Sequence, residues 1–103
     1  MFKAMILLKR SDELSFNEFS SWWLDSHAPL ARQLPNLQRA VFNLVGADGD
    51  AEYDGISELW FATEADFKAA YASEIGKTVA ADSISKVSRR ERLLVTEHPV
   101  YSI

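Results

Sequence analysis

The chain contains no cysteine among its 103 residues. This absence excludes disulfide bonds, thiolate metal sites and a cysteine nucleophile, and it favours a reducing, cytoplasmic setting. Glycine and proline are scarce, with four and three residues, and no glycine-rich loop opens a helix after a strand. The sequence therefore lacks a phosphate-binding loop, and we expect no nucleotide cofactor.

Basic residues are fewer than acidic ones: the chain has 11 lysines and arginines and 15 aspartates and glutamates, which gives a net charge of −4. An acidic chain repels phosphate backbones, so we expect no nucleic-acid partner. The apolar run between Lys3 and Lys9 is too short for a signal-peptide core or a membrane span. These features predict a cytoplasmic protein that does not bind membranes.

The order of apolar and polar segments predicts a ferredoxin-like α+β fold, β-α-β-β-α-β, with one antiparallel sheet and helices on one face. Residues 1–103 are interpreted as a single domain. Ser15 with Glu18, and Thr63 with Asp66, are typical helix caps. Gly76 is expected to stop the second helix, and the segment 77–85 is ambiguous. The expected strands cover Lys3–Lys9, Leu37–Val45, Ile56–Ala62 and Arg90–Glu97, with a hairpin at the loop Gly46–Gly55.

The expected strands are apolar on both faces, which indicates that both faces of the sheet are covered. Met5 and Leu7 alternate with the equally apolar Ile6, whereas a sheet with one solvated face alternates apolar and polar residues. Two helices cover only one face, and the other would expose more apolar surface than a soluble monomer usually shows. The pattern therefore predicts a homodimer that packs sheet against sheet.

The first helix carries an apolar stripe that includes a histidine. Helical spacing joins Phe16, Phe19, Trp23, His27, Leu30 and Leu34. Pro29 has no N–H for the carbonyl of Asp25, so the helix is expected to kink or break there. Such a kink would open packing beside His27, with Trp22 and Trp23 as apolar walls.

A partly buried imidazole in such a position suits general-base chemistry at neutral pH. The alternative is that His27 only marks the bend and bonds a freed carbonyl. The stripe leaves both interpretations open. His98, near Pro99, is expected at the surface or an interface.

The stretches "FNEFSSWWLDSHAPLARQLPNLQRAVFN" and "YDGISELWFATEADFKAAYAS", with Asp82 and a closing "VTEHPVY", resemble the EthD family. This family is named for a protein of ethyl tert-butyl ether degradation and is similar to methylmuconolactone methylisomerase. The resemblance covers nearly the whole chain and implies a dimeric α+β barrel. Asn36 replaces the family's usual glycine after "LP", and asparagine also tolerates a left-handed backbone.

The resemblance implies a pocket between helices and sheet that contains His27. Asn43, Glu58 and Tyr71 are candidate polar liners, and Trp60 joins Trp22 and Trp23 as a candidate wall. Glu58 is expected to lie beside His27 and orient its ring; alternatively it pairs with an arginine at the sheet edge. The basic stretch "SKVSRRER" from Ser85 is interpreted as a solvated strand entry.

These observations favour a cofactor-independent isomerase or lyase that moves a proton on a small lactone, enol or carbonyl compound, as in xenobiotic degradation. His27 would be the general base and Glu58 its partner. Two alternatives remain: a non-catalytic dimeric ligand-binding protein, and a monooxygenase that uses haem or oxygen. Two histidines without cysteine do not supply a structural zinc site, and no HExxH pattern is present, so no metal is expected.

Overall fold

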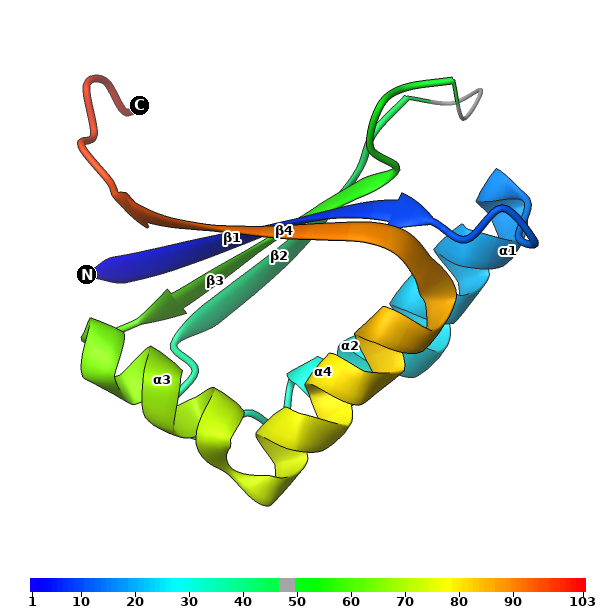
Figure 1. Ribbon diagram of the computed structural model, residues 1–103. Helices are drawn as coiled ribbons and strands as arrows, with labels where there is room; N and C mark the ends of the chain where they lie inside the picture. Colours follow the sequence, from blue (N-terminus) through cyan, green and yellow to red (C-terminus); the bar gives the residue numbers. More distant parts are fainter. Residues whose placement is uncertain (47–49) are drawn as a thin grey trace.

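The computed structural model describes residues 1–46 and 50–103 of the chain. The elements follow the expected order, with one helical region more than predicted (Figure 1). In chain order they are β1 (Phe2–Arg10), α1 (Phe16–Ser21), the π-helix η1 (Trp22–His27), α2 (Ala28–Ala31), β2 (Arg39–Leu44), β3 (Gly55–Phe61), α3 (Glu64–Ala72), α4 (Glu74–Lys86) and β4 (Val87–Thr96). The predicted hairpin loop Gly46–Gly55 lies partly outside the described residues.

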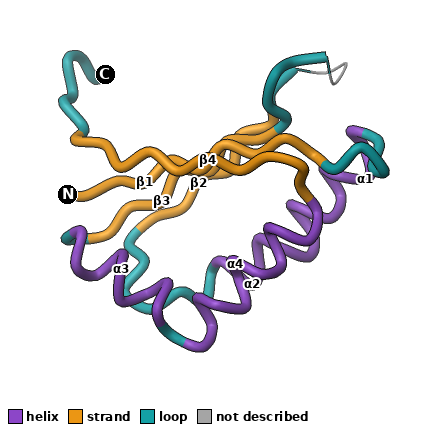
Figure 2. Tube along the Cα trace, viewed as in Figure 1, coloured by secondary structure: helices purple, strands orange, loops and turns teal. Residues whose placement is uncertain are grey.

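The four strands form one antiparallel sheet in the order β2-β3-β1-β4. All the helices lie below one face of this sheet, which gives two layers (Figure 2). In the described part of the chain, no helix covers the other face. The fold is therefore the ferredoxin-like α+β architecture predicted from the sequence.

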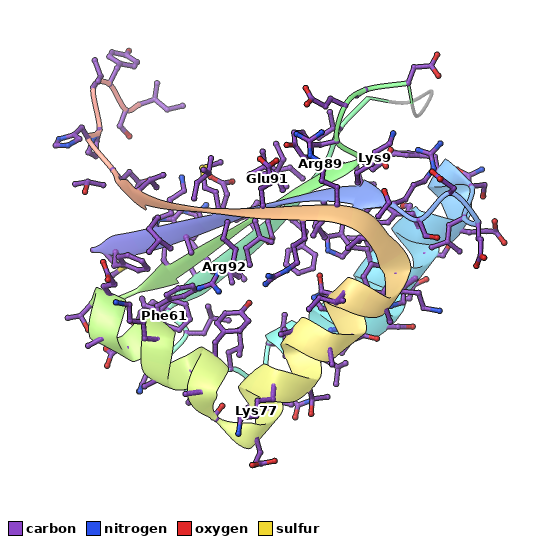
Figure 3. The ribbon with its side chains drawn as sticks, viewed as in Figure 1. Lys9, Phe61, Lys77, Arg89, Glu91 and Arg92 are labelled. Carbon is purple, nitrogen blue, oxygen red and sulfur yellow. The ribbon has the colours of Figure 1, made fainter. Side chains whose placement is uncertain are left out.

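Strand alternation separates a helix-facing surface from an outer surface. Figure 3 shows Phe61 and Arg92 on the helix side and Lys9, Arg89 and Glu91 on the opposite side. The core lies between sheet and helices and includes the fully buried Ala4, Leu8, Phe19, Trp23, Leu59, Phe61 and Phe67. The outer surface carries the partly or largely exposed apolar side chains Met5, Leu7, Val41, Ile56 and Leu93. That a second subunit covers this outer surface stays a prediction.

Pro29 is accommodated by a wider helical winding. The capping box of Ser15 and Glu18 forms as predicted and starts α1. Over η1 the winding widens, and the N–H of Ala28 donates to the carbonyl of Trp23, five residues back. Pro29 then occupies the first turn of α2, where a missing N–H is tolerated. The helical path continues through the proline, so the predicted kink or break takes the form of a wider winding and not of a break.

Gly76 does not end the second helix as predicted, because α3 already ends at Ala72 and Gly76 lies in the first turn of α4. The chain bends at Ser73, whose hydroxyl accepts the N–H of Gly76 and caps α4. A Cβ on Gly76 would stand 2.0 Å from the carbonyl oxygen of Ala70. Gly76 therefore allows α3 and α4 to meet closely, and the ambiguous segment 77–85 is helical.

Candidate functional site

His27 lies on the buried stripe of the first helical region, as its spacing predicts, and is 5% exposed. Its Nδ1 lies 2.8 Å from Oδ2 of Asp82 on α4. The indole N–H of Trp22 reaches Oδ1 of the same carboxylate at 3.5 Å. Because a carboxylate only accepts hydrogen bonds, Nδ1 of His27 is the donor in this pair. The contact joins residues that are far apart in sequence.

Burial lowers the pKa of His27 below its ordinary value of 6.5. Asp82 acts in the opposite direction, and the nearby cation Arg90 lowers the pKa further. The imidazole is therefore mostly neutral at pH 7, with its proton on Nδ1. A neutral ring held in this way leaves the lone pair of Nε2 to act as a base.

Aromatic rings enclose His27 on several sides. The centre of the Trp22 ring lies 5.1 Å from the centre of the imidazole, and the centre of the Phe42 ring, on β2, lies 6.1 Å from it. Trp23 stacks on Phe42 at 4.5 Å. A Cβ on Gly55 would stand 2.7 Å from the indole of Trp23, so only glycine admits this ring at the start of β3. These rings hold His27 in apolar surroundings, which explains its lowered pKa.

A small cavity adjoins His27 between the helices and the sheet. The space open to the centre of a water-sized sphere is about 10 Å³, close to the minimum of roughly 10–15 Å³ for one water molecule. Four polar side chains line it together with His27: Ser57, Tyr71, Ser83 and Arg90. Burial raises the pKa of the Tyr71 phenol, so this hydroxyl keeps its proton at neutral pH.

A wider groove of about 470 Å³ runs between the helices and β2. Its lining includes Leu24, Arg32 and Arg39. Ala31 and Phe42 line both the groove and the cavity beside His27. These two side chains therefore lie between the groove and the cavity.

The predicted site residues on the outer surface do not lie with His27. Glu58 forms an ion pair of 2.6 Å with Lys3 and accepts a 3.0 Å hydrogen bond from Asn43. These contacts, with Lys3 first, lower the pKa of Glu58. The prediction that Glu58 lies beside His27 is wrong, because Glu58 extends from the opposite face of β3; the predicted alternative partner, an arginine, is a lysine here.

Trp60 also belongs to the outer surface and not to the wall beside His27. Its indole N–H donates to Glu97 at 3.1 Å, and the side chains of Lys3 and Arg39 lie over its ring. Among the predicted liners, Trp22, Trp23 and Tyr71 are thus the residues that approach His27, while Asn43, Glu58 and Trp60 form a separate polar network.

Sequence reasoning missed Asp82 as a partner of His27 and Arg90 as a cavity residue. Asp82 belongs to a segment whose helical state was ambiguous. Arg90 is not a solvated strand entry, because it pairs with the buried Leu8 across β1 and β4 and shares its face. The register of β4 against β1, had it been known, would have placed Arg90 on the helix side.

The described residues bring together no group of three or more histidine, aspartate or glutamate side chains that could hold a metal ion. Binding of a haem at His27 would require most of the aromatic walls to move, so the residues present do not fit that group. In the described ranges, the helices are too short or too polar to cross a bilayer.

Residues 11–86 match the sequence profile of the EthD domain. No curated protein shows a significant match to the chain. Asn36 adopts the left-handed backbone that its place in the family pattern predicts, with φ of 62°.

Solved structures with the same fold include an ethyl tert-butyl ether degradation family protein from Bacillus halodurans. It is 20% identical, with a TM-score of 0.81 over 95% of this chain and 100% of its own. A dimeric ferredoxin-like protein of unknown function from Thermobifida fusca is 14% identical, with a TM-score of 0.75 over 93% and 90%. The hydroxynitrile lyase of Passiflora edulis is 14% identical, with a TM-score of 0.75 over 98% and 96%.

Proposed function

Since the chain belongs to the EthD domain family, we propose that it is a cofactor-independent isomerase or lyase. Its substrate would be a small lactone, enol or carbonyl compound, of the kind met in the degradation of organic molecules. His27 is the general base of this reaction. The proposal places the reaction in the space beside His27, inside each subunit.

The observation that carries the proposal is the 2.8 Å contact between the buried His27 and Asp82, beside the rings of Trp22 and Phe42. The carboxylate fixes the proton on Nδ1 and orients the ring, while burial lowers the pKa of His27. An oriented, neutral imidazole is a suitable base near pH 7. A histidine that only marked a helix bend would not need a carboxylate partner on another helix.

In the proposed reaction, Nε2 of His27 removes a proton from the carbon next to the substrate carbonyl. The resulting imidazolium is stabilised by Asp82, and it returns the proton to another atom of the substrate. Trp22 and Trp23 provide apolar walls, and the Tyr71 hydroxyl is a candidate donor to the enolate oxygen. The substrate enters from the groove when the Phe42 side chain moves aside.

Proton exchange in D₂O tests this function on simple carbonyl compounds, whatever the natural substrate is. Unsaturated γ-lactones and cyclic ketones are incubated with the protein, and deuterium incorporation next to the carbonyl is followed by NMR. The substitution His27→Gln is expected to lower the exchange rate by about 10²- to 10⁴-fold, the usual contribution of a general base. His98→Gln is the matched control, because His98 is exposed in the C-terminal tail, and it should leave the rate unchanged.

Equal rates for the wild type and His27→Gln would contradict the proposed role of His27. If the wild-type protein bound the lactones without exchanging any proton, the chain would instead be a ligand-binding protein of the same family. Binding is measured separately, through the fluorescence of the tryptophans beside the site.

The functional unit in this proposal is a homodimer in which two sheets pack face to face. The support is the uncovered outer surface with Met5, Val41 and Leu93, together with the dimeric state of the Thermobifida fusca neighbour. The polar network of Lys3 and Glu58 would then lie at the subunit interface. Sedimentation at micromolar concentration is expected to give twice the mass of one chain.

A further inference from the structure

Arg90 brings a positive charge into the cavity beside His27. The residue extends from β4 toward the helices, as its neighbour Arg92 does in Figure 3. Its Nε is buried and has no hydrogen-bond partner among the described residues. The ion pairs of the described residues do not include Arg90, and Asp82, which lies on α4, is paired with His27. A guanidinium so placed lacks a counter-ion.

The second buried side-chain atom without a partner in the described residues is Nε1 of Trp23. Trp23 lines the same cavity as Arg90. Both atoms are hydrogen-bond donors, and neither can accept. The residues that line the cavity therefore include two with an unused donor, and one of these is positively charged. Such a lining complements a negatively charged group that only accepts hydrogen bonds.

We propose that Arg90 selects substrates that carry a carboxylate, which it binds through its guanidinium while His27 acts on the carbon skeleton. This inference rests on the proposed function, because it names the class of molecule that the same site takes. Arginine suits this role, because its planar fork matches the two oxygens of a carboxylate. A buried donor left without a partner destabilises a protein, so an acceptor that reaches these donors once the Phe42 side chain moves aside is favoured.

Several charged groups surround the proposed carboxylate. Arg90 and Arg92 extend from β4, Asp82 lies on α4 and His27 on η1. The guanidinium of Arg92 lies over the rings of Phe67 and Tyr71. Arg90 is therefore the arginine that is better placed to bind the carboxylate. Asp82 would repel an anion, but its charge is shared with His27 and Trp22. The bound carboxylate would in turn raise the pKa of His27, since it neutralises the cation that lowers it.

Matched pairs of acids and amides test the proposal. Propionate is compared with propionamide and benzoate with benzamide, because the members of each pair have nearly the same shape and differ in charge. Binding is followed by tryptophan fluorescence and by the NMR signals of the His27 ring. We expect the wild-type protein to bind each acid about 10- to 100-fold more tightly than its amide, as a charged hydrogen bond requires.

Arg90→Gln is expected to abolish this preference, so that the acids bind no more tightly than the amides. Lys77→Gln removes the same charge from the exposed side of α4 and should preserve the preference. In the ligand-free protein, Arg90→Gln should also raise the pKa of His27, an effect that a purely structural role would not produce. If Arg90→Gln does not fold, Arg90→Lys keeps the charge but loses the fork, and it should weaken acid binding selectively.

Equal binding of acid and amide by the wild type would overturn the inference and would mean that a water molecule satisfies the two donors. Loss of the preference in Arg32→Gln, and not in Arg90→Gln, would also overturn it, because the anion would then lie in the outer groove. The variant His27→Gln separates this inference from the proposed function. It should still bind the acids, whereas it should lose proton exchange.

Discussion

His27 and Asp82 form a hydrogen bond of 2.8 Å although they belong to different helices. The contact crosses from η1 to α4 and lies against the ring of Trp22. It orients the imidazole and determines which ring nitrogen carries the proton. The relationship is the structural basis for treating His27 as more than a residue at a helix bend.

Asp82→Asn is expected to lower the pKa of His27 further. In the wild type, burial lowers this pKa and the Asp82 carboxylate partly counteracts it, so removal of the negative charge leaves burial and Arg90 unopposed. An asparagine side chain is also able to donate, which permits the other tautomer of the ring. NMR titration of the ring, with ¹H–¹⁵N correlation to identify the tautomer, measures both effects. An unchanged pKa and tautomer in Asp82→Asn would show that the pair is not coupled in solution.

His27 is expected to make the folded state less stable at mildly acidic pH. Its pKa is lower in the folded protein than the ordinary value of 6.5, so below that pH the unfolded chain binds more protons. The stabilising contribution of the neutral His27 should therefore be fully present above about pH 6.5. Below that pH the free energy of unfolding should decrease, down to the folded pKa. Urea unfolding at pH 7.5 and 5.0 measures the change.

His27→Gln provides the control for this pH dependence. The variant lacks the titrating group, so its free energy of unfolding should change less between the two pH values. Carboxylates with lowered pKa values, such as Glu58 and Glu97, titrate below this window. A variant with the same pH dependence as the wild type would assign the effect to another group.

The sequence predicted the fold and the burial of His27, because both depend on local periodicity. Helical spacing places Phe19, Trp23 and His27 on one stripe whatever the tertiary structure. It did not predict which face of β3 meets the helices, because that strand carries large apolar side chains on both. The alternation of side chains along the strand correctly places Glu58 and Trp60 on the same face. The helices, however, cover the other face, which carries Ser57 and Leu59.

Asp82 and Arg90 could not be assigned to the site for a different reason. Their approach to His27 depends on the angle at which α4 leaves the bend at Ser73 and on the register of β4 against β1. Neither quantity is encoded in a short stretch of sequence. The helical winding at Pro29 was likewise hidden, since a proline removes a hydrogen bond but does not specify whether the helix breaks or widens.

Gly55→Ala is expected to destabilise the protein by about 1–3 kcal/mol, the usual range for an overpacked core. The added Cβ would meet the indole of Trp23 at 2.7 Å. Trp23→Phe shortens this ring, so the double variant should be more stable than the sum of the two single changes predicts. Urea unfolding of the four proteins gives the coupling energy, and strictly additive effects would show that the ring and Gly55 do not constrain each other.

Leu93→Glu is expected to convert the proposed dimer into a monomer. Leu93 and Leu94 are neighbours on β4 with nearly equal exposure, 48% and 47%, but they extend from opposite faces of the sheet. Leu93 pairs with Met5 on the outer surface, and Leu94 pairs with the buried Ala4 on the helix side. A charge at Leu93 would be buried without a partner between two sheets, which is strongly unfavourable.

Leu94→Glu introduces the same charge beside the helices and should leave the mass measured by sedimentation unchanged. Equal effects of the two substitutions would mean that the outer surface is not the dimer interface, and a monomeric wild type would contradict the sheet-to-sheet assembly altogether.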